Sequence, residues 1–145
     1  MPEEKAGPPP PMVLALILCD GIHQDPATKK CTLLGTFSTI SVRKFPAVHR
    51  QLAIHVALTG GHGETVMRVV LTRGDEDAAP LFFKEGKILF KDPRMVAELN
   101  FGIANVTFTQ PGEYRIQVFG SNELLMERRL YVLQLPPPPP KPPEA

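Results

Sequence analysis

Residues 52–58 read Leu-Ala-Ile-His-Val-Ala-Leu, with a large aliphatic side chain at every second position. The same period recurs at residues 114–118, Tyr-Arg-Ile-Gln-Val, where the intervening positions are polar. A period of two is typical of a β-strand, because successive side chains point to opposite faces of a sheet. Both stretches therefore predict strands with one buried face and one solvated face.

Further runs of strand composition are separated by turn-forming residues rich in Gly and Pro. They cover residues 13–19, 32–42, 65–72, 81–90, 95–108 and 125–135. A change of apolar phase within the fifth run predicts a bulge near Ala104. Several short strands with such turns between them are typical of a sandwich or barrel. We therefore expect an all-β fold, a two-sheet antiparallel sandwich of about eight strands that is immunoglobulin-like or C2-like.

One segment leaves a choice between helix and strand. Residues 121–135 can form a helix, or can return as the second strand of a hairpin with Tyr131, Leu133 and Leu135 on one face. We favour the hairpin, because residues 119–122 tolerate the positive φ angles of a tight turn.

The prolines divide the chain into three parts. Of 17 prolines, five lie in residues 1–11 and seven in residues 136–145. Proline fixes φ and has no backbone N–H to donate, so these parts are expected to be disordered, solvated tails. A β-sandwich domain is predicted between them, at residues 12–135. Whether the tails are recognised by a partner or act only as spacers stays open.

The charge and the first apolar run exclude several classes of protein. Sixteen Lys and Arg nearly balance fifteen Asp and Glu, so neither nucleic acid nor an anionic membrane surface is an expected partner. The apolar run 12–19 is far below the roughly 20 residues of a membrane-spanning helix. Glu3 and Glu4 stand where an export signal would be basic. We therefore expect a cytoplasmic protein in which Cys19 and Cys31 are free thiols.

Three segments have distinctive sequences. They read Ala-Leu-Ile-Leu-Cys-Asp at 15–20, Cys-Thr-Leu-Leu-Gly-Thr-Phe at 31–37 and Phe-Thr-Gln-Pro-Gly-Glu-Tyr-Arg at 108–115. Over nearly all of residues 12–135 the chain resembles a family of small bacterial proteins catalogued as a domain of unknown function. The resemblance implies a β-sandwich and no established activity. The third segment is also similar to the entry of the penultimate immunoglobulin-like strand, which implies a corner position for Tyr114.

A catalytic interpretation would centre on Cys19, Asp20 and His23 as a thiol hydrolase, because a cysteine nucleophile needs a base to form the thiolate. The alternative is structural. Cys19 ends an apolar strand, and Asp20 stands where a turn needs a side chain that caps backbone N–H groups. We therefore predict a structural role for Asp20, no catalytic residue and no enzymatic activity.

Metal binding is the third possibility. Asp75, Glu76 and Asp77 offer the oxygen ligands that calcium prefers, but they also suit a solvated hairpin turn, which we favour. The four histidines never stand at the spacing of zinc ligands. His55 is expected on the wetter face of its strand. No metal or other cofactor is therefore predicted.

The first strand carries apolar side chains on both faces, with Leu14, Leu16 and Leu18 on one of them. Because a two-layer sandwich needs one apolar face, another segment or another molecule must cover the second. We therefore predict a non-catalytic protein-interaction or structural module. The alternatives are a calcium or small-ligand-binding sandwich and the thiol hydrolase. The candidate partner-binding residues are Leu14, Leu16, Leu18, Pro137, Pro138 and Pro139.

Overall fold

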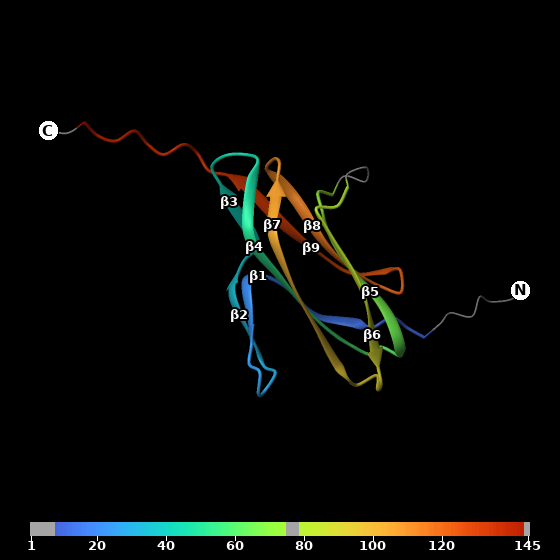
Figure 1. Cartoon of the computed structure of the whole chain (residues 1–145). Coiled ribbons are helices and arrows are strands. Elements are labelled where there is room, and N and C mark those ends of the chain that lie inside the picture. Colours follow the sequence, from blue (N-terminus) through green and yellow to red (C-terminus); the bar gives the residue numbers. More distant parts are fainter. Residues whose placement is uncertain (1–7, 75–78, 144–145) are drawn as a thin grey trace, which may run out of the picture.

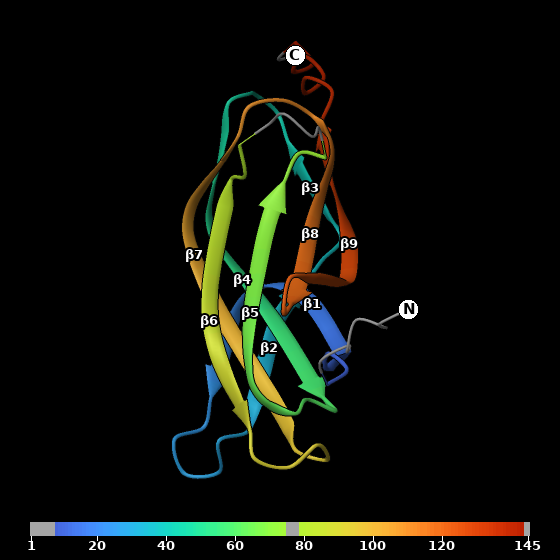
Figure 2. The same ribbon diagram turned by 90° about the vertical axis from the view of Figure 1, so that its right-hand side faces the viewer.

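The computed structural model describes residues 8–74 and 79–143 and folds them into two stacked β-sheets without a helix (Figure 1). The strands are β1 (Met12–Gln24), β2 (Cys31–Thr36), β3 (Thr39–Val42), β4 (Ala47–Thr59), β5 (Gly63–Thr72), β6 (Phe82–Phe90), β7 (Val96–Phe108), β8 (Gly112–Gly120) and β9 (Glu123–Gln134). Sheet A has the order β2-β1-β4-β7, and sheet B has the order β3-β9-β8-β5-β6. The predicted all-β sandwich is confirmed, and Figure 2 shows its two layers.

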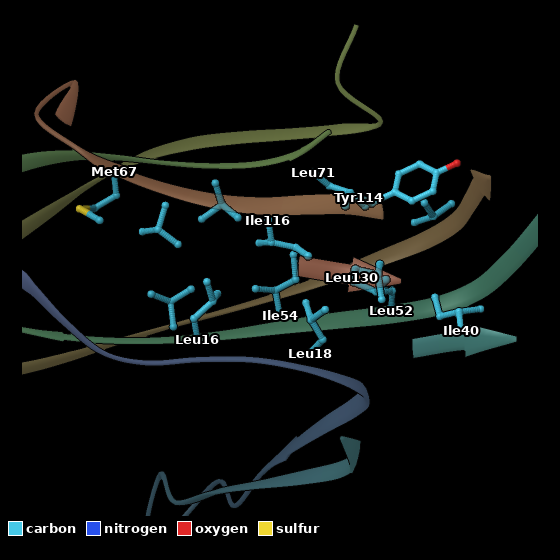
Figure 3. Close-up of a cluster of buried hydrophobic side chains, with 14 of the residues drawn as sticks. Leu16, Leu18, Ile40, Leu52, Ile54, Met67, Leu71, Tyr114, Ile116 and Leu130 are labelled. Atoms are coloured by element: carbon cyan, nitrogen blue, oxygen red, sulfur yellow. The ribbon is translucent and has the colours of Figure 1, made fainter. Parts of the chain in front are cut away.

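The core fills the space between the inner faces of the two sheets. Its centre is formed by the alternating residues that first indicated strands, all fully buried: Leu52, Ile54, Val56, Leu58, Ile116 and Val118. Leu16 and Leu18 of β1 belong to the same cluster, to which Leu130 of β9 contributes from sheet B (Figure 3). The period of two therefore places one face of each strand against the facing sheet.

The expected strand at 32–42 is two strands in different sheets. β2 pairs with β1 in sheet A, whereas β3 runs parallel to β9 in sheet B, with Thr39 opposite Tyr131. The chain crosses between the sheets at Phe37 and Ser38. This crossing raises the number of described strands from the expected eight to nine and adds one parallel pair to an otherwise antiparallel sandwich.

A half-buried arginine of β9 holds this crossing in place. Arg128 donates from Nη1 to the carbonyl oxygen of Leu16 at 2.7 Å and from Nη2 to Ser38 Oγ at 2.8 Å. β2 pairs with β1 from Cys19 onward, so Leu16 lies on the part of β1 that β2 does not reach. Arg128 therefore links sheet B to sheet A and satisfies a carbonyl at this edge, as buried backbone oxygens require.

In β1 the alternation of core-facing and outward-facing side chains is interrupted near its start. Its register with β4 shifts between Val13 and Ala15, which is a β-bulge at Leu14. As a result Leu14 is 51% exposed, whereas Leu16 and Leu18 are 6% and 0% exposed and belong to the core. The assignment of Leu16 and Leu18 to a partner-binding face is therefore corrected, and of the three only Leu14 is accessible.

The backbone geometry and strand pairing decide two other segments, residues 121–135 and the surroundings of Ala104. Residues 121–135 contain β9 and no helix, and the preceding turn has φ angles of 50° at Ser121 and 67° at Asn122, as a tight hairpin turn requires. The bulge expected near Ala104 is absent, because β4 and β7 keep one register. Asn105 instead takes a φ of 57° opposite Arg50, and both strands change apolar phase there.

Tyr114 lies at the start of β8, the penultimate strand. Its hydroxyl donates to the carbonyl oxygen of Gln110 at 2.7 Å, and its ring packs edge-on against Phe108 with 5.0 Å between centroids. The side chain is 1% exposed. This geometry is the tyrosine corner of immunoglobulin-like domains, in which the hydroxyl binds backbone a few residues upstream.

Candidate functional site

The end of the β1–β2 hairpin lies across the outer face of sheet A. Cys31, the first residue of β2, has its Sγ 3.4 Å from Asn100 Nδ2 and 3.8 Å from Glu98 Oε2, and both partners belong to β7. β4 separates β1 from β7 in the sheet. The hairpin must therefore bend over β4 to make these contacts, and it covers part of the face that points away from the core.

The hairpin turn is built on Asp25 rather than on Asp20. Asp25 Oδ1 accepts hydrogen bonds from the backbone N–H groups of Ala27 at 2.8 Å and Thr28 at 3.0 Å. These N–H groups, that of Thr28 first, lower the pKa of the Asp25 carboxyl. β1 continues through Asp20 to Gln24, so the turn expected at Asp20 starts five residues later. The reason is that β1 pairs with β4 up to Cys19 and with β2 from Cys19 to Gln24, so it stays in a sheet beyond Asp20.

A chain of polar contacts leads from a buried histidine of β4 to the hairpin. His55 is 8% exposed, and its Nδ1–H donates to Asn100 Oδ1 at 2.7 Å. Asn100 Nδ2 in turn donates to Cys31 Sγ. The expectation that His55 occupies a wetter face is therefore wrong, because the hairpin covers this face of β4. Asn100 lies between the imidazole and the sulfur, so the polar chain fastens the hairpin rather than pairing a thiol with a base.

Beside this chain lies a pocket of about 250 Å³, which we call the hairpin pocket. It is lined by Ile22, Gln24, Gln51, Ala53, Asn100, Phe101 and Gly102. The polar side chains among these seven residues are three neutral amides, and the rest of the lining is apolar. Each amide has two N–H donors and an acceptor oxygen, and Gln24 and Asn100 use some of these groups within the chain. The remaining groups suit an uncharged ligand that both donates and accepts hydrogen bonds.

Sequence reasoning missed the hairpin pocket, although one signal was present. Along residues 52–58 the positions between the large aliphatic residues are Ala53, His55 and Ala57. A strand whose second face is also poor in charge reads as buried on both faces. Ala53 and Ala57 are 3% and 8% exposed, so this face is indeed covered. The sequence does not show which segment covers this face, because the contacts that bring the β1–β2 hairpin over β4 join residues far apart in the sequence.

The three residues of the thiol-hydrolase interpretation are not assembled into a site. Cys19 is fully buried and its thiol donates to the carbonyl oxygen of Ala53 at 3.8 Å. Burial raises the pKa of the Cys19 thiol, and the charge of Asp20 adds to this increase. Asp20 points to the other face of β1, where its Oδ1 is 3.9 Å from His49 Nε2. His23 lies further along β1, in the part paired with β2.

The two thiols are expected to differ widely in reactivity. Cys31 is half-exposed and should react with a thiol reagent in the native protein, whereas Cys19 should react only after unfolding, since it is buried and its pKa is raised. The difference is measured by counting the thiols that react with and without denaturant. Equal, rapid reaction of both thiols in the native state would contradict the placement of Cys19, and a Cys31→Ser variant identifies which thiol reacted.

The remaining predicted positions do not form a metal or partner site that the structure describes. Asp75, Glu76 and Asp77 fall in the gap at residues 75–78, outside the described residues. Among residues 8–74 and 79–143, no cluster of three or more His, Cys, Asp or Glu side chains is placed to hold a metal ion. Pro137 and Pro138 line a shallow depression with Arg43 and Lys44, and Pro139 is exposed beyond it.

The fold defines the class of protein. Two packed sheets, a tyrosine corner on the penultimate strand and a short strand parallel to the last one make this an immunoglobulin-like β-sandwich. The model of a "Family of unknown function (DUF6941)" matches residues 14–133, so the chain belongs to that family. This confirms the resemblance to a domain of unknown function. No curated protein matches the chain.

Several solved structures are similar in fold. An immunoglobulin-like protein (PA1606) from Pseudomonas aeruginosa is 9% identical, with 88% of this chain and 99% of that one covered and a TM-score of 0.39. The CARDB domain of the PF1109 protein from Pyrococcus furiosus, solved with di-metal ions, is 18% identical, with coverages of 87% and 96% and a TM-score of 0.39. The alkylpurine DNA glycosylase AlkC of Pseudomonas fluorescens is 8% identical over 66% of this chain, with a TM-score of 0.42. The chain spans 27% of that glycosylase.

The described residues also bear on membrane insertion. Nowhere in residues 8–74 and 79–143 is there a helix with the length and apolar character needed to cross a bilayer.

Proposed function

We propose that this domain is a non-catalytic protein-interaction module that binds an uncharged, extended stretch of a partner protein at the hairpin pocket. The observation that carries the proposal is that the polar groups lining the pocket are the amides of Gln24, Gln51 and Asn100. A peptide group has one donor and one acceptor, and side-chain amides match both. A charged ligand would find no counter-charge among these lining residues and would lose its hydration.

The size of the hairpin pocket supports a chain segment rather than a cofactor. Pockets that enclose whole small molecules usually measure roughly 300–1,000 Å³, and this one is about 250 Å³. That volume holds one or two residues of a peptide. Ile22 and Ala53 supply apolar contact at the same place, which gives a mixed surface of the kind that protein interfaces use.

The competing functions have less support. The thiol hydrolase would need a nucleophile and base in contact, and Cys19 is buried with a raised pKa. A calcium or small-ligand role would rest on the acidic residues 75–77, which the structure does not describe. Cys19 and Cys31 are free thiols, which fits our proposal that the module works in the cytoplasm. The proline tails are proposed as spacers or accessory contacts through Pro137, Pro138 and Pro139.

The test is a selection of peptides from a displayed random library on the full-length protein, followed by NMR titration with the selected peptide. We expect the side-chain NH₂ signals of Gln24, Gln51 and Asn100 to shift on binding. Substituting Gln51→Ala should weaken binding by about tenfold, because one hydrogen-bonding partner is lost.

The matched control is Gln117→Ala, which removes the same side chain from the outer face of sheet B. It should leave the affinity unchanged. Selected peptides that shift signals elsewhere, or that bind both variants equally well, would refute the hairpin pocket as the binding site. Failure to select any peptide would also contradict the proposal.

A further inference from the structure

β6 is an edge strand of sheet B. Within the described residues 8–74 and 79–143 it pairs with β5 alone, over Phe82–Phe90 (Figure 2). The backbone N–H and C=O groups on its other side can pair with a further strand, which is the property that allows an edge to extend a sheet. This edge lies in the sheet opposite the hairpin pocket, so the inference below does not depend on the proposed function.

The outward face of β6 carries a symmetric pattern. Its residues are Phe83, Glu85, Lys87 and Leu89, and Gly86 is the midpoint between the first and the last. Phe83 and Leu89 are 53% and 54% exposed, so both apolar side chains are accessible to a second copy of the chain. The order along the strand is apolar, acidic, basic, apolar. An antiparallel second copy of this face therefore places its basic residue opposite the acidic one and its acidic residue opposite the basic one.

We propose that β6 pairs antiparallel with β6 of a second copy of this chain, with the two-fold axis at Gly86. In this register Glu85 lies opposite Lys87 of the second copy, and Phe83 lies opposite Leu89 of the second copy. The two-fold symmetry repeats both pairs, as an interface between identical surfaces requires. Opposite charges and apolar pairs directly across a ladder are the contacts that stabilise sheets. The two copies of sheet B become one continuous sheet.

The same sequence disfavours the neighbouring registers. Residues directly opposite each other in the paired strands must lie on the same face of the sheet. The two-fold axis can therefore move along β6 only in steps of a whole residue. An axis at Glu85 would place two glutamates opposite each other, and an axis at Lys87 would do the same with two lysines. Like charges directly opposite are destabilising. The charges therefore specify the register centred on Gly86.

Two charged neighbours are compatible with this pairing. Lys87 Nζ is 3.4 Å from Glu64 Oε1, but both side chains are more than half exposed, so Lys87 can also reach across the interface. Lys84 is on the inward side of the edge, a position that can hinder pairing. It is exposed, and its long stem allows the ammonium group to stay in water while its methylene groups contact Ile88 of the second copy.

The first test is the mass of the full-length protein by light scattering over a range of concentrations. We expect a dimer, twice the 16.0 kDa of the chain. Glu85→Lys should raise the dimer dissociation constant at least about tenfold, because it creates two like-charge contacts. The swap Glu85→Lys with Lys87→Glu should restore the dimer. The matched control Glu123→Lys makes the same charge change at the β8–β9 turn and should have no effect.

A crosslink tests the axis directly, even if the charge variants alter stability. Residues directly opposite in an antiparallel pair have Cα atoms about 4.5–5.5 Å apart, within the range of a disulfide. In a Cys31→Ser background, Gly86→Cys should therefore form a disulfide-linked dimer on mild oxidation, whereas Lys84→Cys should not. A wild-type protein that stays monomeric, a dimer that Glu85→Lys leaves intact, or equal crosslinking at both positions would each overturn the proposal.

Discussion

Replacing Tyr114 with alanine is expected to lower the free energy of unfolding by about 3–5 kcal/mol, because it empties a fully buried aromatic site. The ring is 1% exposed and packs against Phe108. The substitution also removes the hydrogen bond to the carbonyl oxygen of Gln110. Urea denaturation followed by circular dichroism would measure the loss.

Two variants separate the causes of this effect. Tyr114→Phe keeps the ring and removes the hydroxyl, so it should cost only about 0.5–1.5 kcal/mol. Tyr131→Ala removes the other tyrosine of the chain, which is 39% exposed, and should cost less than Tyr114→Ala. Equal losses at Tyr114 and Tyr131, or iodination of native Tyr114 as fast as that of Tyr131, would contradict the corner position.

The strands were predictable because their signal is local. In residues 52–58 and 114–118 each large side chain stands two positions from the next, and the structure buries all of these side chains between the sheets. Turn residues also act locally. Ser121 and Asn122 adopt the positive φ angles that a two-residue hairpin turn needs, and β9 follows as a strand.

The sheet assignment was less predictable because it depends on distant partners. Nothing within residues 32–42 shows that the chain leaves sheet A at Phe37, since the crossing is held by Arg128, about 90 residues away. The bulge at Leu14 is likewise a property of pairing with β4. Both faces of β1 are apolar in the sequence, so alternation alone does not tell which face meets the core, and Leu16 and Leu18 were assigned to the wrong surface.

The candidate site was least predictable, because it exists only where the hairpin bends over sheet A. Cys31, His55 and Asn100 are spread over 70 residues and carry no motif spacing. Cys19, Asp20 and His23 are close together in the sequence and were predicted to be structural, and the adjacent Cys19 and Asp20 point to opposite faces of β1. A covered second face could be inferred from Ala53 and Ala57, whereas the amides of the hairpin pocket could not.

Replacing Leu16 with lysine is expected to destabilise the domain by at least about 3–5 kcal/mol, enough to unfold a domain of ordinary stability. The leucine side chain is 6% exposed and lies in the inter-sheet core (Figure 3), on β1 opposite Val56 of β4. The substitution loses its apolar contacts and also forces an ammonium group into a cluster of apolar side chains, so the cost exceeds that of a cavity. Thermal and urea unfolding of the purified variant would measure it.

Leu14→Lys is the matched control, because it introduces the same charge two residues earlier on the same strand. Leu14 is 51% exposed at the bulge, so this variant should change the free energy of unfolding by no more than about 0.5 kcal/mol. The contrast tests the register of β1 directly, since an uninterrupted alternation would put Leu14 and Leu16 on the same face. Equal losses in both variants would show that β1 is not bulged at Leu14, and a folded, stable Leu16→Lys protein would show that the side chain of Leu16 lies on a surface.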